Sequence, residues 1–413
     1  TAGVSVSYGA GWPEMDGFVE VAAGARLSNG PDVKHQDVTL LETRAQLKKR
    51  YFFEQGYLGE HSGMLDIKAE GVLDGYFDGK TAAQFRELNL ALTPFPDLDV
   101  KAGRQVLTWG TGDYLFINDL FPKDYVSFFS GRDDEYLKKP SDAVKMSFYA
   151  DALNIDAIAI PVFEPNETAE GDRLSFYDSF QGGIAGKKSD RFLAEPSHDL
   201  SNTEYALRAF RTVGRYEAAG YFFHGFYKNP VAYEDEAARR LFYPRLDVYG
   251  ASLRGPFAAG IVNVEAGYYD SRQDSGGNNR LIPNSMVKAM AGYSQDLGND
   301  WRVGFQYLLE KQLRYSAYEE NLLAQDLRFD EYRHLLTQRV TKLFKQQTVE
   351  VSVFNFYSPS DQDGYLRSSV AYNITDQWKT TLGVNVPWGR DSFTEFGQMQ
   401  ENKNIYLRVR YSF

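Results

Sequence analysis

The chain has 413 residues, 43% of them hydrophobic, with a mean hydropathy of -0.45 and a formal net charge of -11. No run approaches the roughly 18–20 apolar residues that a membrane-spanning helix needs, and the negative charge argues against general nucleic-acid binding. The absence of cysteine excludes disulfides, thiolate metal sites and cysteine nucleophiles.

Aromatic residues make up 15% of the chain, with 28 Tyr and 29 Phe. Girdles of Tyr, Trp and Phe at the two interfaces of a membrane would account for this excess. An aromatic-rich soluble all-β protein, such as a sandwich or a propeller, would account for it equally well, so the residue pattern has to decide. The chain starts at Thr1 with no basic and apolar leader, and we expect a mature protein whose signal peptide has been removed.

Segments in which apolar and polar residues alternate predict β-strands along much of the chain. Successive side chains of a strand point to opposite faces, so each segment has one apolar and one polar face. In the first, Leu40–Phe53, Leu41 and Leu47 fall on one face and Arg44 and Lys48 on the other. In chain order, the pattern recurs at Met64–Asp74, Val262–Tyr269, Val287–Ser294, Trp301–Gln312 and Trp378–Val386.

The last ten residues, Asn404–Phe413 (NIYLRVRYSF), alternate without a break. Ten residues is the length of a tilted membrane strand. An ordinary edge strand would leave the apolar face, from Ile405 to Phe413, without cover. A final strand that ends in Phe, with an aromatic residue two positions earlier, resembles the closing strand of bacterial outer-membrane proteins. That resemblance implies that Phe413 belongs to the signal recognised by the barrel-assembly machinery.

The predicted connections are alternately short and long. Short ones fall near Pro94–Leu98, Asp151–Leu153, Gly214–Arg215, Pro256–Gly260, Gly298–Asp300, Lys345–Gln347 and Thr375–Gln377. Long ones fall near Thr111–Ser141, Pro165–Asn202, Asn229–Phe242, Asp274–Asn284, Ser316–Asp330 and Gly389–Lys403. Tight periplasmic turns and long extracellular loops alternate in this way in transmembrane barrels. We therefore predict an all-β, antiparallel up-and-down barrel of about 18 strands over residues 17–413, with 16 as the alternative, and a periplasmic or lumen arm over residues 1–16.

The polar face of each strand would line the lumen, because strands in lipid must close into a barrel and turn their apolar face outward. Alternation selects the basic pore-lining candidates Arg44, Lys48, Arg50, Arg208, Arg245, Arg302, Arg333, Arg339, Arg367, Lys379, Arg408 and Arg410. Lys101 and Lys288 belong to the same basic set, and Asp247 is among the acidic candidates. Arginines along a channel would favour anions, since guanidinium binds carboxylate in bidentate fashion. Charge pairs that only keep the wall rigid are the alternative.

A long connection, Thr111–Ser141, follows the predicted strand Val100–Gly110. Loops of this length are usually functional, and we expect it to fold into the lumen as a constriction, with an external cap as the alternative. Its candidate residues are Asp113, Tyr114, Asn118, Asp119, Lys123, Asp124 and Arg132. A second candidate is the connection Pro165–Asn202, with Arg173, Asp178, Lys187 and Lys188. The acidic runs Arg132–Glu135 (RDDE) and Tyr233–Glu236 (YEDE) are expected to be solvated, with a calcium site as a weaker alternative.

The GRQ element, with Gly103, Arg104, Gln105, Trp109 and Gly110, adds a weaker signature. The chain resembles large outer-membrane porin-like channels and is similar in style to the alginate-export and substrate-specific porin families. That resemblance implies a barrel of 16 or 18 strands and passage of small anionic or saccharide solutes. Strict alternation directs Gln105 into the lumen and Arg104 outward, unless a bulge at Gly103 reverses both.

We therefore predict a channel of the bacterial outer membrane for small polar solutes, anions or saccharides. The alternative is a barrel that sheathes or docks a partner protein for efflux, export or electron transfer. An enzyme is not expected, because the histidines are scattered and no HExxH or GxSxG motif occurs. No cofactor or metal is expected. The expected partners are outer-membrane lipid and lipopolysaccharide, a small polar solute and the assembly machinery, with a periplasmic partner left open.

Overall fold

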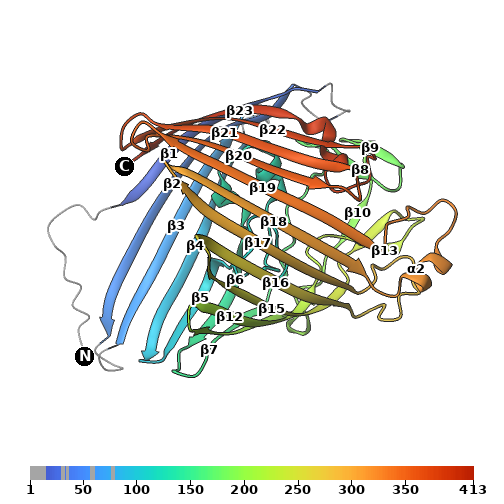
Figure 1. The fold of residues 1–413 in the computed structure, drawn as a ribbon, viewed down its shortest axis with the longest axis horizontal. Coiled ribbons are helices and arrows are strands. Elements are labelled where there is room, and N and C mark those ends of the chain that lie inside the picture. Colours follow the sequence, from blue (N-terminus) through green and yellow to red (C-terminus); the bar gives the residue numbers. More distant parts are fainter. Residues whose placement is uncertain (1–14, 29–32, 34–36, 56–60, 76–79) are drawn as a thin grey trace.

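The computed structural model describes residues 15–28, 33, 37–55, 61–75 and 80–413. Within these residues, eighteen antiparallel strands form one continuous sheet. The sheet closes into a barrel because β1 (Asp16–Arg26) pairs with β23 (Asn404–Ser412), from Phe18↔Ser412 to Arg26↔Asn404 (Figure 1). The predicted barrel of 18 strands is confirmed. The predicted arm lies almost entirely outside the described residues.

Each strand between these two pairs with its neighbours in chain order. They are β2 (Val38–Gln55), β3 (His61–Asp74), β4 (Lys80–Phe95), β5 (Leu98–Val106), β6 (Pro140–Phe148), β7 (Asn154–Ile160), β11 (Glu204–Val213), β12 (Tyr216–Phe226), β15 (Arg245–Phe257), β16 (Gly260–Ser271), β17 (Met286–Gly298), β18 (Trp301–Gln312), β19 (Tyr332–Phe344), β20 (Val349–Ser358), β21 (Asp363–Asn373) and β22 (Trp378–Gly389).

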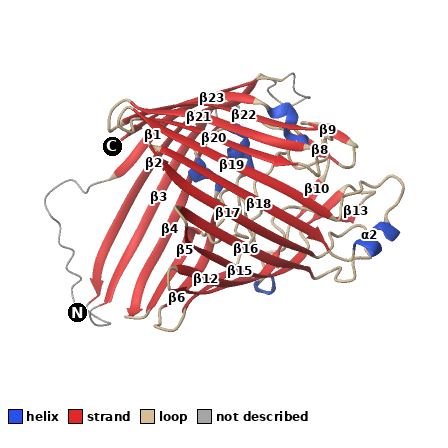
Figure 2. Ribbon diagram, in the orientation of Figure 1, coloured by secondary structure: helices blue, strands red, loops and turns tan. Residues whose placement is uncertain are grey.

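Smaller elements lie in the connections and are drawn by type in Figure 2. The helical ones are α1 (Tyr125–Ser130), η1 (Asp134–Leu137), η2 (Leu200–Asn202), α2 (Tyr315–Asn321) and η3 (Gly397–Asn402). The short strands are β8 (Phe176–Asp178), β9 (Gly183–Ala185), β10 (Phe192–Ala194), β13 (Ala232–Asp235) and β14 (Arg240–Phe242). No helix in the described part of the chain is long and apolar enough to cross a membrane.

The predicted alternation of short and long connections is confirmed. Only two residues join β4 to β5, β11 to β12, β15 to β16 and β17 to β18, whereas 107–139 and 161–203 are long. Since β23 starts after the long connection 390–403, the C-terminus lies at the end of the barrel that carries the short turns (Figure 1). The predicted strand Val100–Gly110 is corrected: β5 ends at Val106, because the chain turns into the barrel there.

The two faces of the wall differ as the alternation predicts. On β18, Trp301, Phe305 and Tyr307 are exposed, whereas Gln306 and Leu308, on the opposite face, are buried. The exposed apolar face continues on other strands through Leu41, Leu47, Val144, Met146, Leu207, Tyr249, Leu253, Val264, Tyr268, Leu382, Ile405 and Leu407. An apolar band on the outside of a closed cylinder is the reverse of a soluble protein's surface.

The lumen face carries apolar side chains as well as polar ones. Met290, Leu308 and Leu335 face inward from β17, β18 and β19 and are buried together with Ile117 and Phe128 of segment 107–139. This cluster is a hydrophobic core inside the barrel. The lumen face is therefore apolar where apolar residues of segment 107–139 pack on it, and polar elsewhere.

Candidate functional site

Residues 107–139, between β5 and β6, cross the interior of the barrel. Near the start of this segment, the backbone N–H groups of Thr111 and Asn118 donate to the buried carboxylate of Glu265 on β16, at 2.7 and 2.8 Å. Near its end, the guanidinium of Arg86 on β4 donates to the carbonyl of Lys138 at 2.7 Å.

The middle of the segment contacts a different part of the wall. The hydroxyl of Tyr365 on β21 donates to the carbonyl of Phe128 at 3.1 Å, and the amide of Asn404 on β23 donates to that of Phe129 at 2.8 Å. A segment of 33 residues that touches β4, β16, β21 and β23 can reach all of them only from inside the cylinder. Figure 2 shows short helical pieces, in blue, within the outline of the barrel.

Local sequence explains how the segment bends inside the barrel. Asp124 caps α1 by accepting from the backbone N–H of Ser127 at 2.7 Å. Gly131 ends the helix with φ at +90°, a conformation that favours glycine. A Cβ at Gly131 would lie 2.2 Å from the ring of Tyr406 on β23, so no other residue fits without a shift. The chain leaves this turn directly into the acidic run, Arg132–Glu135.

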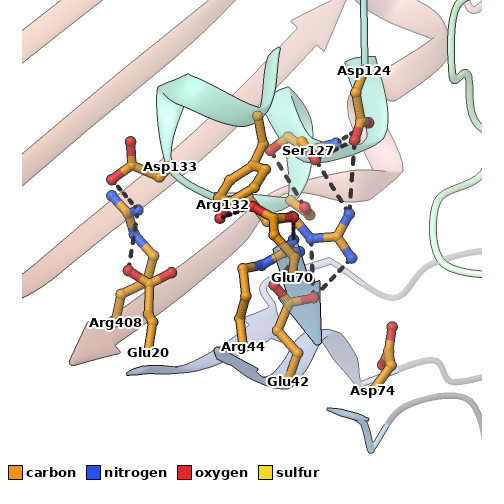
Figure 3. Close-up of polar contacts among 12 residues, drawn as sticks. Glu20, Glu42, Arg44, Glu70, Asp74, Asp124, Ser127, Arg132, Asp133 and Arg408 are labelled. Carbon is orange, nitrogen blue, oxygen red and sulfur yellow. Dashed lines mark hydrogen bonds and ion pairs between the residues drawn. The ribbon is translucent and has the colours of Figure 1, made fainter. Parts of the chain in front are cut away.

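The first carboxylate of this run, Asp133, contacts two arginines of β23. Its Oδ2 atom lies 2.7 Å from Arg408 and 3.4 Å from Arg410. Both guanidiniums also approach Glu20 on β1, at 3.8 Å for Arg408 and 2.8 Å for Arg410. Figure 3 shows Arg408 between Asp133 and Glu20. Two lumen arginines are therefore sandwiched between a wall carboxylate and a loop carboxylate.

The next two carboxylates contact further wall cations. Asp134 lies 2.8 Å from Arg367 on β21, and Glu135 lies 3.1 Å from Lys68 on β3. The expectation that Arg132–Glu135 is a solvated run is therefore wrong, because the run folds against the lumen wall. Alternation along the strands predicts which cations face inward, but it does not predict which loop reaches them.

A second cluster fixes the other side of the run. Arg132 donates through Nε and Nη2 to the same oxygen of Glu42 on β2, at 3.0 and 2.8 Å. Arg44 bridges Glu42 and Glu70, at 3.1 Å each, and its guanidinium stacks 4.0 Å from the ring centre of Tyr136 (Figure 3). These charges are buried and compensated, so the cluster holds the segment to the wall.

Two aspartates of segment 107–139, Asp113 and Asp133, differ in acidity. Burial opposes ionisation of Asp133, but Arg408 and Arg410 outweigh it and lower the pKa of Asp133 to about 2. At Asp113, burial prevails over the attraction of Arg339, which lies 2.6 Å away, and the pKa is raised. One loop carboxylate is therefore held firmly in its charged form, while the other is more easily protonated.

The other constriction candidates have structural contacts. Asn118 is bound to Glu265, and Lys123 forms a buried ion pair with Asp119 at 2.9 Å. The hydroxyl of Tyr114 donates to Asp134. Of the predicted set, Asp113, Tyr114 and Arg132 therefore lie with the wall cations, whereas Asn118, Asp119, Lys123 and Asp124 shape the segment itself.

Most of the predicted basic residues face the lumen in ion pairs. Arg50 pairs with Asp66, Arg208 with Glu217 and Asp156, Arg302 with Asp296, Arg333 with Glu310, Asp361 and Glu395, and Lys288 with Glu310. In contrast, no ion pair within the described residues involves Lys48, Lys101 or Lys379. These three lysines lie on the lumen face by alternation and leave their charge uncompensated.

Arg245 and Asp247 are corrections to the prediction. On β15, Leu246 and Val248 are buried in the lumen core, and Asp247 shares the opposite face with exposed Tyr249. Arg245 starts the strand on that outer face, stacks on Phe226 and donates to Asn202. The two faces of β15 alternate as predicted. The face that points into the lumen is the apolar one, because segment 107–139 packs on it.

Alternation alone could not predict the direction of Arg86, whereas Gln105 and Arg104 lie as strict alternation predicts. Arg86 points inward together with Glu87 because the register shifts opposite Lys68 and Ala69. Gln105 is buried with regular pairing, and Arg104 faces outward toward Asp142, 3.3 Å away, so Gly103 does not reverse them.

The second candidate connection, 161–203, reaches across the barrel mouth. Arg173 donates to the carbonyl of Thr39 on β2 at 2.9 Å and to the carboxylate of Asp74 on β3. Asp178 accepts within its own connection, from Phe180 and Ser189.

Comparison with solved structures identifies the fold. Three Pseudomonas aeruginosa proteins, OccK11 (OpdR), OccK5 (OpdH) and OccD3 (OpdP), match with TM-scores of 0.54, 0.54 and 0.55 at 9%, 10% and 12% identity. The matches cover 97%, 97% and 98% of this chain and 96%, 97% and 92% of those chains. No family model and no curated protein matches the sequence. The predicted porin-like barrel is confirmed as a fold.

Proposed function

We propose that this chain is a channel of the bacterial outer membrane for small anionic solutes. The observation that carries this proposal is the row of inward cations on β2, β3, β19, β21 and β23 opposite segment 107–139. Guanidinium groups recognise carboxylate and phosphate, and cations along a pore select for anions. The exposed apolar band supports a location in lipid.

The burial of four aromatic side chains inside the barrel favours anions over saccharides as the solutes. Phe128, Phe129, Phe356 and Tyr365 pack on one another and are buried. A sugar would need an open aromatic face to stack on, which these four rings do not offer, whereas an anion can approach Lys48, Lys101 and Lys379, which have no ion-pair partner within the described residues. A sheath for a partner protein is the second candidate, but segment 107–139 already fills the space that such a partner would need.

Planar-bilayer recording tests this function. Purified protein, inserted between unequal concentrations of KCl, is expected to carry a steady current with a reversal potential that reports preference for chloride. A current that prefers potassium would contradict anion selectivity. An absence of current from protein that heat-modifiable gel migration shows to be folded, and that flotation with lipid vesicles shows to be inserted, would contradict the channel itself.

A further inference from the structure

The acidic segment Asp133–Glu135 and the wall cations around it are arranged like a ligand in its binding site. We call Lys68, Arg367, Arg408 and Arg410 the basic wall. All four lie within 3.1 Å of a carboxylate of Asp133, Asp134, Glu135 or Glu20. The loop thus places its carboxylates where an anionic solute would place its own.

The arginines of the basic wall are more deeply buried than the loop carboxylates that they contact. The side chains of Arg367 and Arg408 are each 11% exposed, whereas that of Asp134 is 54% exposed and that of Asp133 is 28% exposed. The carboxylates are therefore the partners that water and solutes can reach. Exchange of one carboxylate for another conserves the charge pairs, so it costs far less than breaking them in a buried site.

The segment can leave the wall without unfolding of the loop. Upstream, Phe128 and Phe129 are anchored in the lumen core, and downstream Leu137 is buried in the same core. The acidic segment lies between these anchors, after the turn at Gly131. It is a short span held at both ends and by the guanidinium of Arg86, which donates to the carbonyl of Glu135, so a local opening that breaks this contact can expose the wall while the barrel stays intact.

We infer that Asp133–Glu135 acts as an internal competitor for the anion site on the basic wall, and that solutes with two carboxylates displace it. This inference rests on the proposed function and adds a solute class to it. A dicarboxylate can replace two of the loop contacts at once, whereas chloride can replace one. Because the wall is mostly occupied, the apparent affinity for a solute is reduced by the fraction that is open.

Hydrogen–deuterium exchange tests displacement directly in the wild-type protein. Succinate is expected to increase amide exchange in residues 131–138 relative to chloride at equal ionic strength, because the freed segment opens. Unchanged or slower exchange in these residues would overturn the inference. Hydrogen–deuterium exchange does not depend on ion current, so this test of displacement is valid even if the barrel does not conduct.

A charge-neutral variant supplies the second arm. D133N/D134N/E135Q keeps the shape of the segment and removes the competitor. We expect it to bind succinate at least about fivefold tighter than the wild type, measured by block of chloride current. The matched control is E234Q/D235N/E236Q, an equal charge change in the run Tyr233–Glu236. Equal affinity in both variants would overturn the inference, whereas a silent wild-type barrel would overturn the proposed function instead.

Discussion

At the scale of single residues, the lumen cations fall into two kinds. Arg367, Arg408 and Arg410 contact carboxylates, so their fields largely cancel at a distance. Lys48 and Lys379 have no such partner within the described residues. Selectivity depends on net charge along the path, and we therefore expect the lysines to govern it more than the arginines do.

The variant K48Q/K101Q/K379Q tests this distinction. It removes three uncompensated lumen charges and leaves every ion pair intact, so the anion-to-cation permeability ratio should fall while thermal stability stays unchanged. The measurement is the reversal potential in a KCl gradient. The control is R239Q/R240Q, at two arginines of a long connection, and it should leave the permeability ratio unaltered. An unaltered ratio in the lysine variant would show that these lysines do not line the ion path.

Acidification should act on the segment in two steps. The pKa of Asp113 is raised, so as pH falls it protonates first and the contact with Arg339 weakens. The pKa of Asp133 is lowered from 3.8 to about 2, so its stabilising contribution is complete above about pH 4 and is lost as pH falls toward 2. Single-channel conductance should change in two stages. Asp113→Asn should remove the first stage alone, and loss of both stages would contradict the assignment.

At the scale of elements, period-two alternation predicted strands well. It placed Trp301–Gln312 on β18 residue for residue, and Asn404–Phe413 to within one residue of β23. It could not predict which lumen faces are apolar, since that depends on a loop distant in sequence. Leu246 and Met290 face the lumen because segment 107–139 covers them. The same contact explains why alternation did not locate the partners of Asp133.

Removal of the aromatic anchors should loosen the segment but not the barrel. A buried Phe→Ala substitution costs about 3–5 kcal/mol, and F128A/F129A removes two rings of the lumen core. We expect larger and noisier single-channel currents, with heat-modifiable migration preserved because the strand pairing is untouched. Phe257→Ala, at an outward ring that is 59% exposed, is the control. Currents that match the wild type would show that the segment does not narrow the path.

At the scale of the whole molecule, closure follows from the backbone. A strand in hydrocarbon has no water to satisfy its N–H and C=O groups, so the first and last strands must pair. Sequence alone predicted the strand number, the alternation of connections and the outward apolar face. It did not predict the fold of the lumen segment, whose contacts with β4, β16, β21 and β23 link residues far apart in the chain.

The most direct test of the whole account is a single-cysteine scan along β18 in lipid bilayers. The chain has no native cysteine, so each introduced thiol carries the only spin label. Labels at Val303, Phe305 and Tyr307 should be accessible to oxygen dissolved in hydrocarbon, and labels at Gly304, Gln306 and Leu308 should be shielded from it. Accessibility that does not alternate, or that alternates in the opposite phase, would contradict a barrel whose apolar face contacts lipid.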